Sequence, residues 1–510
     1  MPGKIYLVGA GPGDPALLTL KGRRCLEQAD VVVYDYLANP RLLDFTPPRS
    51  ERLLVGKHGG GERVDQEHIN HLLVARALQG KVVVRLKGGD PFIFGRGAEE
   101  ALAARQAGID YEVVPGVTSA IAVPAYAGIP LTHRDLASGV SFIAGYEDPS
   151  KNEPAVRWGP LAGSGTTLVI LMTQRQLAGN MDKLIAGGLD PDTPAAVVAW
   201  GTRAAQRTVV GTAATLAGHA ADAGIEPPAI AIVGEVVRLR EHLEWFERRP
   251  LFGTRIVITR PRQQAADFAD RLEALGAEIV PFPTIETVTV PSTDALDDVL
   301  RRAADFDWVV FTSANGVRVF FDRLRQVSAD IRDWHGARFA AIGPQTARAL
   351  EACCVRVDAV PDEFRAEGVI ELLGRYDLTG RRVLLPRAAG ARQILPEKLR
   401  ALGATVEEVI TYSAVRPDVD TSELRTLLGQ GRIDLITFTS SSTVDNFVAL
   451  LGGDVRQLVG RTIIGCIGPI TAETVRRHGW DAHVQPPTYT IPAFVEAIVR
   501  HFTAVRSRRP

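Results

Sequence analysis

The chain has 510 residues, of which 46% are hydrophobic and 23% are charged, and its 58 Lys and Arg residues nearly balance its 59 Asp and Glu residues. This length exceeds what one hydrophobic core normally supports, so we expect two to four folding units. The balanced charge argues against a bulk polyanion such as nucleic acid as the partner. No apolar run approaches the roughly 20 residues of a membrane span, and the four cysteines lack metal-ligand spacing. The N-terminus lacks the layout of a signal peptide, so we expect a cytoplasmic protein with no membrane partner and no metal site.

Polar residues follow four of the five strands that we expect in the first part of the chain. Short apolar runs typical of buried strands occur at residues 5–8, 31–34, 53–55, 82–84 and 111–114. Helical patterns separate these runs, and alternating strands and helices predict a parallel, doubly wound α/β sheet. Asp35, Lys57, Asp90 and Thr118 would then lie along one edge, where open α/β sheets bind their ligands.

Residues 85–100, RLKGGDPFIFGRGAEE, place two adjacent glycines between an expected strand and an expected helix. Gly88 and Gly89 would let the backbone approach a flat ligand closely, and Asp90 could accept hydrogen bonds from hydroxyls or an amine. A glycine turn of this kind also serves as a plain connector, so by itself it does not identify a site.

The first turn, GAGPGD at residues 9–14, suggests a dinucleotide-binding loop, because an acid, Asp35, follows about twenty residues later. However, Asp14 stands where the third glycine should be, and Pro12 removes a backbone donor that a pyrophosphate would need. The sequence therefore disfavours a nicotinamide cofactor.

The spacing of the apolar runs changes after residue 131. Longer stretches now separate the runs at residues 140–144, 167–172, 195–199 and 229–233. This spacing predicts a second lobe of mixed α/β type, with a cleft between the two lobes.

Residues 1–246 resemble uroporphyrinogen-III C-methyltransferase, a member of the tetrapyrrole methylases. The motifs that carry the resemblance, in chain order, are VGAGPGDPALLTLKG, VVVYDYL, VGKHGG, RLKGGDPFIFGRGAEE, VVPGVTSA, GIPLTHRD and PAIAIVGEVV. The resemblance implies a two-lobed tetrapyrrole-methylase fold, with lobes at about 1–116 and 117–246, and a homodimer formed through this half. It also implies a tetrapyrrole substrate and S-adenosylmethionine as the methyl donor.

Matched position by position, the resemblance implies S-adenosylmethionine contacts from Pro12, Gly88, Gly89, Asp90, Ile93, Thr118, Ser119, Met172 and Gly201. Asp35 and Lys57 fall at positions assigned to acid–base residues, and the Asp35 carboxylate could take the proton that leaves after methyl transfer. Lys57 could instead bind a substrate carboxylate, a role also open to Arg134 and His133.

The chain departs from the family pattern at two positions. Tyr146 stands where the family often has a histidine, and Trp200 stands where it often has an asparagine. Details of cofactor or substrate packing are therefore in doubt at these two places.

The remainder of the chain repeats itself after a short charged segment, residues 247–253, which we expect to be a linker. Arg260 recurs as Arg387, and the recurring motifs are ALGA at 274–277 and 401–404, FTS at 311–313 and 438–440, and IGPxTA at 342–347 and 467–472. Each unit of about 127 residues alternates strands and helices, which predicts two similar flavodoxin-like parallel α/β lobes.

Both repeats place Ser and Thr at strand-to-helix junctions, namely Ser313, Thr346, Ser440 and Thr471. Helix N-termini offer unpaired N–H groups and a partial positive charge, so we expect these residues to bind substrate carboxylates. Ordinary N-capping of the helices is the alternative.

Residues 254–510 resemble uroporphyrinogen-III synthase, over about 254–505. The resemblance implies cyclisation of hydroxymethylbilane with inversion of ring D and loss of water, without a cofactor. It further implies crossed strands, so that residues 254–285 plus 417–505 form one lobe and 286–416 the other. Tyr412 matches a tyrosine proposed to assist departure of the hydroxyl, although it could also merely pack at the lobe junction.

Together the two resemblances imply a bifunctional enzyme that makes uroporphyrinogen III and methylates it twice to precorrin-2, on the way to sirohaem or cobalamin. Two alternatives stay open. The first half could methylate a later corrin intermediate, or the second half could be a non-catalytic module that senses tetrapyrroles.

Overall fold

The computed structural model describes residues 3–56, 65–146, 156–290 and 292–506 of the chain. The chain divides into two compact units, one made of residues 1–256, 270–279 and 499–510 and the other of residues 257–269 and 280–498. Within the described ranges, no helix combines the length and the apolar character that crossing a membrane requires.

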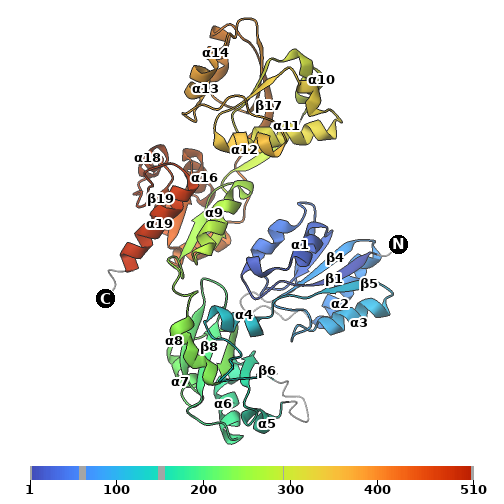
Figure 1. The fold of residues 1–510 in the computed structure, drawn as a ribbon, viewed down its shortest axis with the longest axis vertical. Helices are drawn as coiled ribbons and strands as arrows, with labels where there is room; N and C mark the ends of the chain where they lie inside the picture. The colour runs from blue at the N-terminus through green and yellow to red at the C-terminus, as the bar shows by residue number, and fades with distance from the viewer. Residues whose placement is uncertain (1–2, 57–64, 147–155, 291, 507–510) are drawn as a thin grey trace. The chain divides into compact units, whose positions relative to one another are not determined.

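The first sheet has five parallel strands in the order β3-β2-β4-β1-β5. They are β1 (Lys4–Gly9), β2 (Val31–Tyr34), β3 (Glu51–Leu54), β4 (Val82–Lys87) and β5 (Asp110–Val114). Helix α1 (Leu20–Glu27) covers one face, and α2 (Gln66–Leu78) and α3 (Gly97–Gln106) cover the other (Figure 1). Because both faces are covered, the valine-rich strands are buried, as expected of a parallel sheet.

The second sheet is mixed, with the strand order β6-β7-β10-β8-β9. Its strands are β6 (Val140–Ala144), β7 (Thr167–Leu171), β8 (Pro194–Ala199), β9 (Arg207–Thr212) and β10 (Ala229–Val233). Strand β10 runs antiparallel to both of its neighbours, β7 and β8. Its helices are α4 (Ser119–Tyr126), α5 (Trp158–Ala162), α6 (Leu177–Ala186), α7 (Leu216–Asp222) and α8 (Arg240–Leu243).

The third sheet has four strands in the order β12-β11-β18-β19. They are β11 (Arg255–Ile258), β12 (Glu278–Pro281), β18 (Leu435–Phe438) and β19 (Ile463–Cys466). The associated helices are α9 (Arg262–Ala274), α15 (Ser422–Gly429), α16 (Ser441–Leu451), α17 (Val455–Val459), α18 (Pro469–Arg477) and α19 (Ile491–Arg506). Phe268 of α9 stacks on Phe494 of α19, with ring centroids 5.5 Å apart.

The fourth sheet has five strands in the order β13-β17-β16-β14-β15. They are β13 (Glu286–Thr289), β14 (Trp308–Phe311), β15 (Arg338–Ala341), β16 (Arg382–Ala388) and β17 (Thr405–Val415). The helices of this lobe are α10 (Asp294–Arg301), α11 (Ala314–Gln326), α12 (Pro344–Ala352), α13 (Ala366–Leu373) and α14 (Ile394–Ala401).

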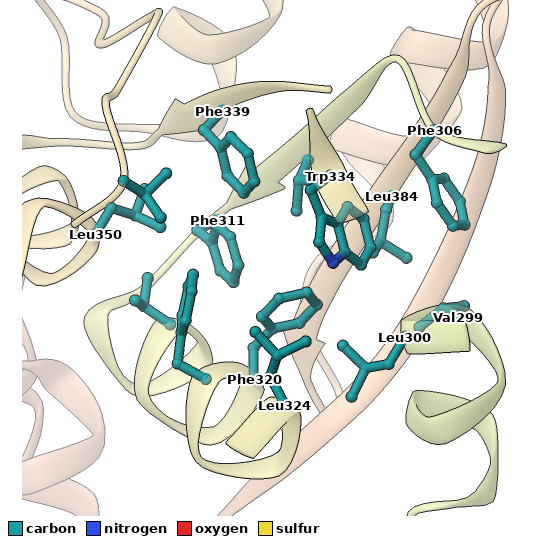
Figure 2. Packing of buried hydrophobic residues seen from close by; sticks show 14 of the residues in the cluster. Val299, Leu300, Phe306, Phe311, Phe320, Leu324, Trp334, Phe339, Leu350 and Leu384 are labelled. Atoms are coloured by element: carbon teal, nitrogen blue, oxygen red, sulfur yellow. The ribbon is translucent and has the colours of Figure 1, made fainter. Parts of the chain in front are cut away.

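An aromatic cluster fills the core on one face of this fourth sheet (Figure 2). Phe320 of α11 lies edge-on to both Phe311 of β14 and Trp334, with ring centroids 5.4 and 5.3 Å apart. Leu300 and Leu324 complete the packing from α10 and α11. The cluster holds α11 on the sheet and so fixes the N-terminus of that helix at the sheet edge.

The two sequence repeats are interleaved between the third and fourth sheets. One repeat supplies β11 and β12 to the third sheet and β14 and β15 to the fourth, and the other supplies β16 and β17 to the fourth and β18 and β19 to the third. The order β12-β11-β18-β19 therefore corresponds to β17-β16-β14-β15. This arrangement confirms the expected fold class, including the crossed strands of the second half.

Residue Glu247, at the start of the segment 247–253, is held firmly by the second lobe. Its carboxylate accepts hydrogen bonds from Gln206 Nε2 at 2.8 Å, Thr208 Oγ1 at 2.6 Å and Arg240 Nη2 at 2.7 Å. The first part of the expected linker is thus fixed in place.

Candidate functional site

Three glycine-containing loops meet at the carboxyl edge of the first sheet, after β1, β4 and β5. The Gly89 N–H donates to the Gly11 carbonyl at 2.8 Å, and the Gly11 N–H donates to the Gly89 carbonyl at 3.2 Å. A Cβ on Gly116 would lie 2.4 Å from the Gly89 carbonyl oxygen, so only glycine permits this approach. Gly89 itself has φ +68°, a left-handed conformation that glycine adopts at little cost.

The carboxylate of Asp90 ties two of these loops together. Oδ1 accepts hydrogen bonds from the backbone N–H groups of Phe92 at 2.8 Å and Ile93 at 3.2 Å, and Oδ2 accepts one from Gly116 at 3.0 Å. Asp90 therefore shapes the loop around it, and its two oxygens retain acceptor capacity for a further donor. Its expected role in ligand binding stays a prediction.

The other expected ligand contacts of the first lobe lie in the same three loops or directly after them. Thr118 caps α4 by accepting the Ala120 N–H at 3.3 Å, and Ser119 is the first residue of that helix. Ile93 is 39% exposed. Pro12 is half-buried in the loop after β1. Helix capping therefore accounts for the Thr118 hydroxyl. The backbone N–H of Ser119 lies in the first turn of α4, where N–H groups have no partner within their own helix.

Asp35 belongs to a buried network of charges that the sequence analysis missed. Its Oδ1 accepts from Arg85 Nη2 at 2.5 Å, and its Oδ2 lies 3.4 Å from the Gly88 N–H. Arg85 Nε and Lys87 Nζ both donate to Glu100 Oε1, at 3.0 and 2.9 Å. Arg85, Lys87 and Glu100 are each at most 3% exposed. The network links the expected proton acceptor directly to the glycine loop.

Burial shapes the electrostatics of this network. Desolvation, reinforced by the nearby Arg85 cation, lowers the pKa of Lys87. Glu100 Oε2 is buried without a hydrogen-bond partner in the part of the chain that the structure describes. The sequence did contain a signal for this network, namely the two charged residues in the valine-rich strand VVVRLK. Buried charges are rare unless they are paired, so these two residues indicate nearby partners. Lys57, which we expected to act beside Asp35, lies outside the described residues.

Met172 and Gly201 lie at one edge of the second sheet. They follow β7 and β8, and both strand ends face the start of β10 through the pairs Leu171–Ile230 and Ala199–Ala229. Met172 is 51% exposed and has φ 56°. Such a conformation is strained for a non-glycine residue and is often found at ligand sites.

The turn at residues 200–203 contacts the loop that contains Pro12. Thr202 Oγ1 accepts the Asp14 N–H at 3.1 Å, and Tyr126 donates its hydroxyl proton to Asp14 Oδ2 at 2.8 Å. A Cβ on Gly201 would lie 2.4 Å from Val123 of α4, so glycine is required there by packing. Trp200 and Thr202, on either side of Gly201, have φ 52° and 67°. The structure thus brings Pro12 and Gly201 into neighbouring loops, whereas Arg134 is an exposed residue of the loop after α4.

In the fourth sheet, Ser313 and Tyr412 meet directly. Their hydroxyl oxygens are 2.7 Å apart, and Ser313 Oγ also accepts the Gly316 N–H at 3.0 Å, which caps α11. Tyr412 is 7% exposed. Thr346, in the first turn of α12, is buried at the same edge, since β14 and β15 are parallel neighbours.

In the third sheet, Ser440 and Thr471 occupy the corresponding places. Ser440 caps α16 by accepting the Thr443 N–H at 3.3 Å, and Thr471 is buried in the first turn of α18. Thr474, in the second turn of α18, donates to Ser441 Oγ, in the first turn of α16, at 2.9 Å. The capping alternative therefore holds for Ser313 and for Ser440. Each cap uses one N–H group of its helix start, so the other N–H groups there could still bind a ligand.

An exposed aromatic residue covers the Gly-Pro turn in each of these two lobes, and the sequence analysis did not identify either. A Cβ on Gly343 would lie 3.2 Å from Phe364, and one on Gly468 would lie 3.3 Å from Tyr489. Both aromatic residues are 61% exposed. The repeat could have identified these two aromatic residues, because Phe364 follows Gly343 at the same sequence spacing as Tyr489 follows Gly468.

Two protein-family models match the chain. The model described as Tetrapyrrole (Corrin/Porphyrin) Methylases matches residues 4–217, and the model described as Uroporphyrinogen-III synthase HemD matches residues 266–496. The two matches do not overlap: the first spans strands β1 to β9 and the second spans strands β12 to β19.

Known proteins align with one or both of these regions. Porphyrin biosynthesis protein HemD from Ruminiclostridium josui is 38% identical over 480 residues, which are 93% of this chain and 94% of that protein. Uroporphyrinogen-III C-methyltransferase from Bacillus subtilis is 41% identical over 361 residues, 71% of this chain and 74% of that protein. S-adenosyl-L-methionine-dependent uroporphyrinogen III methyltransferase from Methanosarcina barkeri is 53% identical over 241 residues, 47% of this chain and 94% of that protein.

Proposed function

Because the chain belongs to the tetrapyrrole methylases through its first half and to the uroporphyrinogen-III synthases through its second, we propose that it catalyses two consecutive steps of tetrapyrrole biosynthesis. The second half cyclises hydroxymethylbilane to uroporphyrinogen III, with inversion of ring D. The first half then transfers two methyl groups from S-adenosylmethionine to that product, giving precorrin-2. The alignment with the Ruminiclostridium josui protein along 93% of the chain carries the proposal, because it spans both halves.

In the first half, S-adenosylmethionine supplies the methyl group when bound. The left-handed Gly89 and the exposed Met172 with its positive φ are features that such a ligand fits. The residues of the chain position the two reactants and exclude water. Asp35, held by Arg85 and by the Gly88 N–H, accepts the proton that leaves the methylated carbon.

In the second half, the Tyr412 hydroxyl donates a hydrogen bond to the departing hydroxyl of the bilane. The C–O bond breaks as the adjacent pyrrole nitrogen supplies electrons, and the leaving hydroxide takes that nitrogen's proton to give water. The electron-poor carbon then forms a C–C bond to ring D, and the proton lost from ring D restores the pyrrole N–H. Ser313, 2.7 Å away, orients the phenol. The helix starts at Ser313, Thr346, Ser440 and Thr471 bind substrate carboxylates through N–H groups and hydroxyls. We take residues 1–246 and 254–510 as the two enzymatic parts, joined by 247–253, and a homodimer formed through the first part.

The test is a coupled assay that starts from hydroxymethylbilane and isotopically labelled S-adenosylmethionine. We expect the isomer III tetrapyrrole carrying two labelled methyl groups. Formation of isomer I alone, at the spontaneous rate, would favour the sensing module for the second half. Isomer III without label, even when uroporphyrinogen III is added directly, would favour a methylase of a later corrin intermediate.

A further inference from the structure

Arg260 and Arg387 occupy equivalent places in the two repeats but have different surroundings. Arg260 follows β11 and Arg387 lies in β16, and these are corresponding interior strands of the third and fourth sheets. Each arginine stands at the carboxyl edge of its sheet, where the capped helix starts also lie.

Arg387 is paired within the protein. Its Nη1 donates to Glu408 Oε2 at 2.5 Å and its Nη2 donates to the Arg392 carbonyl at 2.6 Å, and the residue is 6% exposed. A buried guanidinium with a carboxylate and a carbonyl partner is a structural ion pair.

Arg260 lacks the corresponding carboxylate. The repeat offset that relates Arg260 to Arg387 places Pro281 where Glu408 stands. Arg260 Nε is buried with no hydrogen-bond partner among the described residues, and Nη2 reaches only Gln264 Oε1, at 3.4 Å. Burial lowers the pKa of this guanidinium, and the charge of Asp267 opposes the shift. Such a desolvated donor is costly unless a ligand pairs with it.

Hydrogen bonds between strands place Arg260 beside the helix starts of its own lobe. The Thr259 hydroxyl donates to the Thr437 carbonyl at 2.8 Å, and the Thr284 N–H donates to the Thr259 carbonyl at 3.1 Å. Thr284 Oγ1 in turn donates to the Thr443 carbonyl, in the first turn of α16, at 3.3 Å. Arg260 thus follows β11 at the same edge of the sheet at which Ser440 follows the neighbouring strand β18.

We propose that Arg260 binds a carboxylate side chain of the linear tetrapyrrole substrate through its planar guanidinium fork, whereas Arg387 only stabilises the fold. The inference rests on the proposed synthase activity of the second half. Arginine suits this role because it can donate two parallel hydrogen bonds to one carboxylate. The two repeats have thereby diverged, with one keeping its arginine for the ligand and the other pairing it internally.

The test compares Arg260→Gln with the matched variant Arg387→Gln in the full-length chain, with isomer III formation followed over a range of hydroxymethylbilane concentrations. We expect Arg260→Gln to raise KM about tenfold or more, with kcat changed far less and Tm unchanged or higher. Arg260→Lys, which keeps the charge, should recover part of the loss. The KM of the unaltered protein should rise more steeply with salt than that of Arg260→Gln. Arg387→Gln should lower Tm and leave KM within about twofold.

A KM for Arg260→Gln within about twofold of the unaltered protein would overturn the assignment. Loss of folded Arg260→Gln protein would also overturn it, because it would show a structural role. If the unaltered protein makes only isomer I at the spontaneous rate, the proposed synthase function fails instead, and the two failures are therefore distinguishable.

Discussion

The hydroxyl oxygens of Ser313 and Tyr412 lie 2.7 Å apart, although 99 residues separate them in the chain. Ser313 is the N-cap of α11 and Tyr412 lies in β17, so the contact joins the cap of a helix to the strand after which the chain leaves the lobe. Because Ser313 Oγ also accepts the Gly316 N–H, its position is fixed, and with it the position of the phenol oxygen.

We expect Tyr412→Phe to reduce kcat for isomer III formation by about ten- to a hundredfold, because the variant loses the phenolic donor. The fold should change little, since Ser313 still caps α11 and one hydrogen bond contributes about 1 kcal/mol. Separation of isomers I and III after quenched reactions gives the rate. Ser313→Ala is the control, with a cost of about 1 kcal/mol in stability and a smaller kinetic loss. Full activity of Tyr412→Phe would remove the phenol from the mechanism.

Replacement of Asp90 should separate the two activities. Asp90→Ala leaves the N–H groups of Phe92, Ile93 and Gly116 without their acceptor, so the glycine loop loses its shape. We expect S-adenosylmethionine binding to vanish in titration calorimetry while isomer III formation stays unchanged. Synthase activity of the same polypeptide is the internal control, and an unaltered affinity would exclude Asp90 from the site.

Two adjacent glutamates on α3 allow the buried charge network to be tested for stability. Glu100 is buried and pairs with Arg85 and Lys87, whereas Glu99 pairs with Arg96 at the surface. Glu100→Gln should lower the free energy of unfolding of the first half by about 3 kcal/mol, because it leaves buried cations short of a counter-charge. Glu99→Gln should cost less than about 1 kcal/mol. Denaturant unfolding measures both, and equal effects would contradict the prediction.

Acid should remove a stabilising contribution from Glu112. Hydrogen bonds from Lys21 and Lys4 lower the pKa of Glu112 from 4.5 to about 2. Because the pKa is lower in the folded state, the contribution is fully present above pH 4.5 and is lost as the pH falls towards 2. Melting temperatures of the unaltered protein and of Glu112→Gln should therefore differ at pH 6 and converge near pH 2. The difference should shrink in salt, because the pairs are partly exposed. A difference that does not change with pH would contradict this prediction.

The sequence predicted the fold class because its signals are local or repeated. Valine runs followed by glycine turns mark the parallel strands, and the recurrence of FTS and IGPxTA marks the two lobes. The crossed strands followed from the resemblance to a family and not from the repeat, which by itself suggests a cut near residue 380.

The sequence could not reveal contacts that depend on the packing of distant segments. Asp35, Arg85 and Glu100 come from β2's end, β4 and α3, and no spacing rule connects them. The positive φ values of Met172 and Trp200 could not be predicted either, because non-glycine residues rarely adopt this conformation and nothing in their identity indicates it. The roles assigned to the site residues stay predictions.

The interleaved repeats also set an order of assembly as the chain leaves the ribosome. Strands β11 and β12 emerge early, but their sheet needs β18 and β19, which end at Cys466. All strands of the fourth sheet lie between Glu286 and Val415, so that lobe can close first. Strand β11 therefore stays unpaired on one side until β18 has been synthesised. Pairings this far apart in sequence slow folding. Premature termination between Pro281 and Leu435 would therefore leave β11 without its second neighbour, β18, and such an open sheet edge is prone to aggregation.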